Sequence, residues 1–254
     1  MRGVRVRHRR PGSAAMGACS RSRHESYQAP VTEEQAGCVV LELALTATAC
    51  AARMSPMSFF ERGIGPAAGF AGDGFIVRPL IPTDVGLDHD AVMASREFLY
   101  HWEQDPPYPP VDFSVDDNLV DLQKMDDAHR NGSRYTYTVM NAGESEVLGC
   151  IYLLPNDDRL YQTAEVTSHD GTDLSLVDAT VSFWVRPSTW ERGFERTLLK
   201  AVLRWLRDDW ALERPVIITN ERLDHQIATI ESLGLTRRFD YDREKDMYTS
   251  YAYA

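Results

Sequence analysis

Within residues 178–210, the spacing of the hydrophobic residues changes from a strand-like run to the spacing of a helix. Residues 179–185 are rich in β-branched and aromatic side chains, which is typical of a half-buried strand, and Pro187 ends this run. From Gly193 onward, apolar residues recur at steps of three and four, which places them on one face of a helix. They are Phe194, Leu198, Ala201, Val202, Trp205 and Leu206. The pattern therefore predicts a strand, a tight turn and a long amphipathic helix.

The flanking sequence predicts shorter elements of both kinds. Strands are expected at residues 75–80, 134–140, 146–154, 215–219, 236–241 and 247–253. Helices are expected at residues 88–102 and 223–233. A further helix is expected from a capping pair at Ser114 and Asp117 through about His129, with Asn131-Gly132 ending it. Residues 156–177 are polar and irregular, and we expect a long loop there.

This order of elements predicts an α/β fold. Antiparallel strands followed by β-α-β crossovers give a mixed, mostly antiparallel central sheet with helices on both faces. We expect the domain to span residues 73–254. Residues 1–72 begin with an Arg-rich run and are dominated by small residues, a composition that rarely buries enough apolar area to fold. A targeting leader, a disordered tail and a start codon assigned too early, with Met54 or Met57 as the first residue, are the alternatives for this segment.

Charge and cysteine content narrow the function classes. The net charge of −11 and pI near 5.1 argue against nucleic acid as the main partner. The four cysteines, Cys19, Cys38, Cys50 and Cys150, form no disulfide or metal-binding spacing, so we expect no metal and a cytoplasmic protein. The longest apolar run, residues 38–52, contains Glu42 and is too short to span a bilayer, so no membrane partner is expected.

The turn before the long helix has the chemistry of an anion site. The first turn of a helix exposes N–H groups at the positive end of the helix dipole, which suits phosphate. Gly193 permits close approach of a ligand to the backbone, and Arg192 and Arg196 add positive charge. A plain strand–helix crossover with a glycine in its turn explains the same features.

The run Phe183-Trp184-Val185-Arg186-Pro187, followed by Gly193, resembles the acetyl-CoA-binding segment of the GNAT N-acetyltransferase superfamily. The resemblance implies acetyl-CoA as co-substrate and a backbone N–H near Val185 that donates to the thioester carbonyl. It implies cofactor binding by Trp184, Val185, Arg186, Arg192, Gly193, Phe194 and Arg196. In that superfamily, a carboxylate near the central strand often acts as the base and a Tyr on the last helix as the acid. The matching positions here hold Thr180 and Ile230.

Other side chains must therefore supply the proton transfer. His101 is the first candidate, because histidine changes its charge near neutral pH and this one ends the first predicted helix. Glu103 is the second, as a carboxylate that holds a cationic amine or accepts its proton. With Val185, these residues form the predicted catalytic set. Alternatively, His101 interacts only with the helix dipole and Glu103 belongs to a solvated acidic loop.

The sequence thus predicts an acyl-CoA-dependent N-acetyltransferase that acts by direct transfer to a small-molecule or peptide amine. Trp102, Tyr108 and Phe113 surround a proline-rich loop and either form an aromatic wall for the amine or pack as a rigid loop. Trp190 and Glu195 occupy positions that are Gln or Arg and Gly or Ala in the superfamily. With Thr180 and Ile230, they support the alternative of a catalytically inactive CoA-binding module. A third alternative is an interaction subunit that forms a homodimer through its C-terminal strands.

Overall fold

The computed structural model describes residues 63, 65–103, 108–156 and 163–254, all within one compact unit that spans residues 51–254. The described residues form one nine-stranded sheet in the order β1-β2-β3-β4-β6-β7-β9-β8-β5. Its strands are β1 (Phe70–Gly72), β2 (Phe75–Pro79), β3 (Tyr135–Asn141), β4 (Val147–Pro155), β5 (Glu165–Ser168), β6 (Ala179–Val185), β7 (Pro215–Asn220), β8 (Arg237–Asp242) and β9 (Ser250–Tyr253). Only β6 and β7 run parallel, which confirms the predicted mixed and mostly antiparallel sheet.

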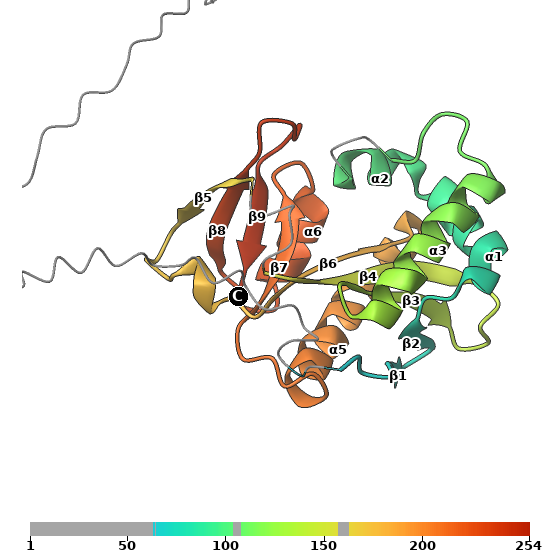
Figure 1. Cartoon of the computed structure of the whole chain (residues 1–254), viewed down its shortest axis with the longest axis horizontal. Coiled ribbons are helices and arrows are strands. Elements are labelled where there is room, and N and C mark those ends of the chain that lie inside the picture. Colours follow the sequence, from blue (N-terminus) through green and yellow to red (C-terminus); the bar gives the residue numbers. More distant parts are fainter. Residues whose placement is uncertain (1–62, 64, 104–107, 157–162) are drawn as a thin grey trace, which may run out of the picture. The chain divides into compact units, whose positions relative to one another are not determined.

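Helices cover both faces of this sheet (Figure 1). They are α1 (Val85–Ala94), α2 (Arg96–Trp102), α3 (Val115–Asn131), α5 (Phe194–Asp208) and α6 (Asp224–Glu231), with short 3-10 turns η1 (Pro82–Asp84), η2 (Leu174–Leu176) and η3 (Pro187–Arg192). Strand β6 contacts the helices on both faces, because its successive side chains alternate between the two faces of the sheet. Val181, Phe183 and Val185 pack with α5, whereas Trp184 packs with residues of α1 and α2.

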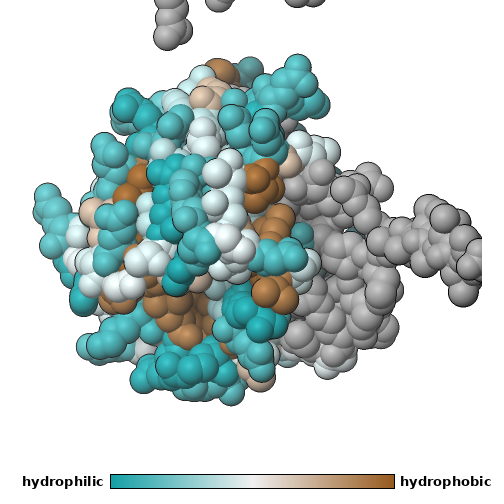
Figure 2. Space-filling model, turned by 90° about the vertical axis from the view of Figure 1, so that its left-hand side faces the viewer, coloured by the Kyte–Doolittle hydropathy of each residue, from teal (hydrophilic) through white to brown (hydrophobic). Residues whose placement is uncertain are grey.

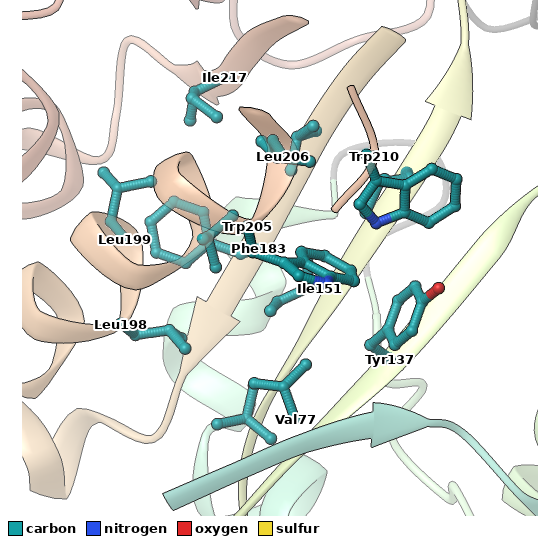
Figure 3. Close-up of a cluster of buried hydrophobic side chains, with 14 of the residues drawn as sticks. Val77, Tyr137, Ile151, Phe183, Leu198, Leu199, Trp205, Leu206, Trp210 and Ile217 are labelled. Carbon is teal, nitrogen blue, oxygen red and sulfur yellow. The ribbon is translucent and has the colours of Figure 1, made fainter. Parts of the chain in front are cut away.

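The larger core lies between the sheet and α5. Strands β2, β3, β4 and β6 present Val77, Tyr137, Ile151 and Phe183 to the apolar stripe of the helix (Figure 3). Trp205 is the central side chain of this stripe: its ring lies 4.8 Å from Tyr137 and 5.7 Å from Trp210, both in edge-to-face geometry. The helix predicted from the three- and four-residue spacing is thus confirmed.

Helix α3 begins and ends where its sequence predicts. Asp117 N–H donates to the Ser114 hydroxyl, and Ser114 N–H donates to the Asp117 carboxylate, which completes a capping box. At the other end, Gly132 takes the left-handed conformation with φ of 73°, which a residue without a Cβ adopts at little cost.

Three expectations need correction. The helix expected over residues 88–102 is two helices, because the backbone at Ser95 leaves the helical region (φ −106°, ψ 8°). Residues 165–168, expected to lie in a loop, form β5, which pairs with β8. Residues 70–72, expected to precede the domain, form β1, which pairs with β2, so the sheet begins ahead of residue 73. Both missed strands are short edge strands defined by their pairing rather than by their own pattern. Residues 1–62 and 64 of the predicted leader lie outside the described residues.

The C-terminal strands lie inside the sheet. Strand β8 pairs with β9 on one side and β5 on the other, and β9 pairs with β7. The side of the molecule that carries β5 and β8 is mostly hydrophilic, with small hydrophobic patches (Figure 2).

Within the described ranges, no helix has the length and apolarity needed to cross a membrane.

Gly149 of β4 allows the close approach of β4 to β6. A Cβ atom at this position would lie 2.0 Å from the carbonyl oxygen of Trp184 and 2.9 Å from the Val185 Cα. We expect Gly149→Ala to lower the free energy of unfolding by about 1–3 kcal/mol or more, because backbone atoms would have to move. Urea denaturation measures this change. Gly143→Ala is the matched control, since a Cβ there would meet nothing closer than the Ser145 hydroxyl at 3.8 Å; equal losses for both variants would contradict the prediction.

Candidate active site

Strands β6 and β7 part at their carboxyl ends. Their parallel pairing runs from Ala179–Pro215 to Val181–Ile217 and stops there. On its other side, β6 remains paired with β4 as far as Val185 opposite Gly149. The N–H of Arg186 donates to Leu148, so the N–H and C=O groups of Val185 and, two residues earlier, Phe183 point away from β4. The backbone of these two residues therefore faces the gap between β6 and β7.

Two side chains enter this gap and bind the Phe183 carbonyl. Gln226 Nε2 donates to it at 2.9 Å, while the Gln226 Oε1 accepts from the Thr219 hydroxyl of β7 at 2.7 Å. Trp102 Nε1 donates to the same carbonyl at 3.0 Å. Gln226 is completely buried. It thus bridges the two strands where their backbones no longer reach one another.

A cavity of about 500 Å³ lies between α2 and the start of α6, and we call it the α2–α6 cavity. Gln226 is part of its wall, so the cavity adjoins the gap between the strands. Its other lining residues are Glu97, Phe98 and His101 of α2, Pro187 and Trp190 of η3, and Arg222, Leu223, Asp224 and His225. Of the segment singled out in the sequence, the turn after β6 contributes Pro187 and Trp190 to this cavity.

The turn between β6 and α5 ends at Gly193. This residue has a φ of 65°, and a Cβ atom built on it would meet no atom within 4 Å. It is also the N-cap of α5, and no side chain caps the helix there. The first-turn N–H groups of α5 thus follow a residue without a side chain, which suits the approach of an anion.

Glu195, in the first turn of α5, is directed toward α6. It is 1% exposed, its Oε2 accepts from the Thr229 hydroxyl at 2.9 Å, and His225 Nε2 lies 3.2 Å from the same oxygen. Burial raises the pKa of Glu195, and its bond with Thr229 and the charge of His225 oppose this shift. The His225 ring in turn stacks on Trp190, with the ring centres 4.5 Å apart.

A second cavity, of about 440 Å³, lies on the opposite face of the sheet from α5, and we call it the α1–α3 cavity. Its wall includes Asp88 of α1, Asn118 of α3 and Trp102 of α2, together with Cys150, Tyr152 and Trp184 from the sheet. Trp102 thus lines this cavity while its indole N–H binds the Phe183 carbonyl in the gap.

The predicted cofactor-binding residues are only partly brought together. Val185 presents its backbone to the gap, and Gly193 lies at the start of α5. Phe194 packs against Phe75, with ring centres 5.4 Å apart. Trp184 points to the other face, where its Nε1 donates to the Tyr152 hydroxyl.

The three predicted arginines differ in their surroundings. Arg186 is 7% exposed, and its guanidinium donates to the Val147 carbonyl and to the Asp90 carboxylate at 2.7 Å. It therefore joins α1 to the sheet. Arg196 donates to the Ser232 hydroxyl at 3.1 Å, and Arg192 is exposed at the end of η3.

The predicted catalytic side chains lie at different cavities. His101 lines the α2–α6 cavity, and its Nδ1 lies 3.0 Å from the Tyr248 hydroxyl. Glu103 is exposed and lines the α1–α3 cavity. Trp102, which lies between them in the sequence, lines the α1–α3 cavity together with Glu103.

Sequence reasoning missed the contributions of Gln226, His225 and Asp88 to these cavities. Gln226 and His225 lie near the start of a predicted helix, where exposure is the ordinary expectation, and Asp88 lies among polar residues of another. A polar residue on the apolar stripe of its helix is the signal that could have found Gln226, since Leu223 and Ile230 flank it at helical spacing.

Comparison with known proteins places this arrangement in a family. Residues 75–236 match the model of the acetyltransferase (GNAT) domain, which covers more than half of the sequence. The chain belongs to the GNAT acetyltransferases. No curated protein matches the sequence.

Solved structures share the fold. The ribosomal-protein-S5-alanine acetyltransferase of Vibrio fischeri is 13% identical, with a TM-score of 0.54 over 73% of this chain and 94% of that one. The acetyltransferase of Salmonella typhimurium that modifies the N-terminal serine of ribosomal protein L7/L12 is 14% identical, with a TM-score of 0.52 over 72% and 94%. The microcin C7 self-immunity acetyltransferase MccE, solved with acetyl-CoA and AMP, is 11% identical, with a TM-score of 0.54 over 75% and 96%. At these identities the likeness establishes the fold.

Glu195 makes a pH-dependent contribution to stability. Because its pKa is raised in the folded state, the folded protein holds a proton that the unfolded chain releases at lower pH. The wild type therefore loses stability as the pH rises from the usual Glu range through the raised value. We expect Glu195→Gln to be more stable than the wild type above this window, by about 1.4 kcal/mol per unit of raised pKa, and to show no such gain below it.

Urea denaturation of both proteins between pH 4 and 8 measures this difference. Glu191→Gln, at an exposed position of η3, is the matched control and should show no pH-dependent gain. A constant difference between Glu195→Gln and wild type across the whole range would show that the charge of Glu195 is not responsible.

Proposed function

We propose that the protein is an acyl-CoA-dependent N-acetyltransferase that moves an acetyl group from acetyl-CoA directly to an amine. The observation that carries this proposal is the parting of β6 and β7 after Val181–Ile217, which leaves the Val185 N–H facing the gap. A fixed backbone donor at this place can bind the thioester oxygen, where negative charge develops during acyl transfer. Membership of the GNAT family supports the same chemistry.

The residues around the gap fit acetyl-CoA at its two ends. Gly193 and the uncapped first turn of α5 suit the diphosphate, and the α2–α6 cavity next to the gap suits the thioester end of the molecule. Glu195 does not oppose the diphosphate, because its carboxylate is buried against Thr229 and His225 of α6. Gln226 and Trp102 must release the Phe183 carbonyl if the cofactor is to pair with β6 at this residue.

Bound acetyl-CoA supplies an activated acyl group. The amine nitrogen forms the new bond to the carbonyl carbon, the carbon–sulfur bond breaks, and the thiolate takes up the proton that the amine loses. The protein has to orient the two reactants, stabilise the oxyanion through Val185 and take one proton from the amine.

His101 is the proposed base. It lines the same cavity as Gln226, whose side chain marks the gap, and its Nδ1 contact with Tyr248 fixes the ring. Glu103, on the other cavity, is better placed to attract a cationic acceptor than to share the proton transfer of His101. The acceptor is a small-molecule or peptide amine. The peptide class is favoured by the N-terminal serine substrate named for the Salmonella typhimurium structure. A homodimer and a cytoplasmic location stay predictions.

Calorimetric titration of acetyl-CoA tests the cofactor site. We expect micromolar affinity, about 8 kcal/mol, for the wild type and at least a hundredfold loss for Gly193→Asp, which places a carboxylate before the first turn of α5. Gly171→Asp is the matched control: Gly171 also has a positive φ, 77°, with no atom within 4 Å of a Cβ, so both variants share the backbone strain. Equal affinities for the two variants would contradict the proposed site.

The pH profile of acetyl transfer tests the base. We expect His101→Gln to lower kcat/KM by about a hundredfold or more and to remove the rise of kcat/KM with pH that a histidine base produces. His169→Gln is the control, because His169 pairs with Asp240 near β8 and lines neither cavity. A profile that keeps its rising limb in His101→Gln would assign the proton transfer to another group.

A second candidate function is a GNAT-like module without catalysis. It is favoured by the Phe183 carbonyl, which already accepts hydrogen bonds from both Gln226 and Trp102. The same titration separates the two functions. Binding of acetyl-CoA together with transfer to any amine supports the enzyme, binding without transfer supports a CoA-binding regulator, and no binding at millimolar ligand to folded protein supports an interaction module.

A further inference from the structure

The α1–α3 cavity contains a buried carboxylate, and neither the family assignment nor the proposed transfer chemistry explains its presence. Asp88 of α1 is 4% exposed and lines the cavity. Its Oδ2 accepts from Asn118 Nδ2 at 2.9 Å, and the Cys150 Sγ lies 3.8 Å from its Oδ1. A carboxylate removed from water is costly unless a cation or several donors compensate it.

The protein itself supplies little compensation. Among the described residues, the hydrogen-bond partners of the Asp88 carboxylate are Asn118 and Cys150, and neither carries a positive charge; the charge of His89 only partly opposes the effect of burial on the pKa of Asp88. Burial is the largest influence on this carboxyl and raises its pKa. The two cations in the cavity wall, Lys124 and Arg134, are exposed, and Lys124 pairs with Asp121 at 3.0 Å.

Asn118 gives a second, independent sign of a missing partner. It is completely buried, it lines the same cavity, and its Oδ1 has no hydrogen-bond partner among the described residues. Buried polar atoms in folded proteins are nearly always bonded, so an orphaned acceptor beside a buried carboxylate calls for a donor. An ammonium group brings three N–H donors and a positive charge, and it satisfies both acceptors at once.

The rest of the wall also suits a cationic ligand. Trp102, Tyr108, Tyr152 and Trp184 line the cavity, and the faces of such rings attract ammonium groups. Burial raises the pKa of both tyrosines, so their hydroxyls stay neutral at physiological pH. The volume of about 440 Å³ falls in the range of small-ligand sites.

We propose that the α1–α3 cavity binds the ammonium group of a small organic amine, with Asp88 as its counter-ion and Asn118 Oδ1 as its second acceptor. The inference rests on the proposed function: the ammonium group held here belongs to the part of the acceptor that fixes its position, and it is distinct from the nitrogen that His101 deprotonates at the α2–α6 cavity. Trp102 connects the two sites, since it lines this cavity and binds the Phe183 carbonyl in the gap where the thioester is expected.

Titration of amines and their matched alcohols into the full chain tests the proposal. The probes are two pairs, phenethylamine with 2-phenylethanol and butylamine with 1-butanol. The two members of a pair have nearly the same shape, but only the amine carries a positive charge. We expect at least one amine to bind about tenfold or more tightly than its alcohol and to shift the indole N–H resonances of Trp102 and Trp184. No amine binding at about 10 mM, or equal affinities within both pairs, overturns the proposal.

Asp88→Asn locates the binding. We expect it to remove the advantage of the amine over its alcohol, whereas Asp116→Asn, at an exposed position of α3, keeps that advantage. Amine binding that survives Asp88→Asn in a folded sample overturns the proposal. If this variant does not fold, the comparison of amine with alcohol in the wild type decides. The titrations contain no acetyl-CoA, so the amine site and the proposed acetyl transfer can each fail without the other.

Discussion

The parting of β6 and β7 is the constraint on which the rest of the domain depends. A parallel pair that stops at Val181–Ile217 leaves backbone groups of β6 without strand partners in the middle of a folded sheet. Buried backbone groups need hydrogen bonds, and here Gln226 and Trp102 supply two of them to Phe183. The positions of α2 and α6 are thereby tied to the same gap that, in the proposed function, holds the thioester.

Strand β6 also lies between the core around α5 and the α1–α3 cavity. Its alternating side chains send Phe183 and Val185 into the core with α5, while Trp184 faces the helices on the other side. The long apolar stripe of α5 fixes the strand on one face, and the packing around Trp205 leaves little freedom for it to move. Within the sheet, Gly149 lets β4 approach β6 closely, and this pairing directs the Val185 backbone toward the gap.

Each face of the sheet has one buried carboxylate that the proposals concern: Glu195 on the side of α5 and Asp88 on the side of α1. Glu195 and Asp88 are both nearly inaccessible, and burial raises the pKa of each. The Oε2 of Glu195 is held within the protein by Thr229 and His225, so Glu195 serves the contact of α5 with α6. Asp88 has only a neutral amide and a thiol as direct partners beside an open cavity. The difference in their partners is the reason for proposing a structural role for one and a ligand for the other.

The sequence by itself determined the elements that carry strong local signals. The period of residues 194–206 predicted α5, and the Ser114–Asp117 pair predicted the start of α3, because helix spacing and capping act over a few residues. The tertiary structure alone decided which side chains meet. It paired β1 and β5 as edge strands, turned Arg186 toward Asp90, placed His101 and Glu103 at different cavities and brought Gln226 to Phe183. These contacts join residues far apart in the chain, and they depend on strand register and helix placement that no local pattern encodes.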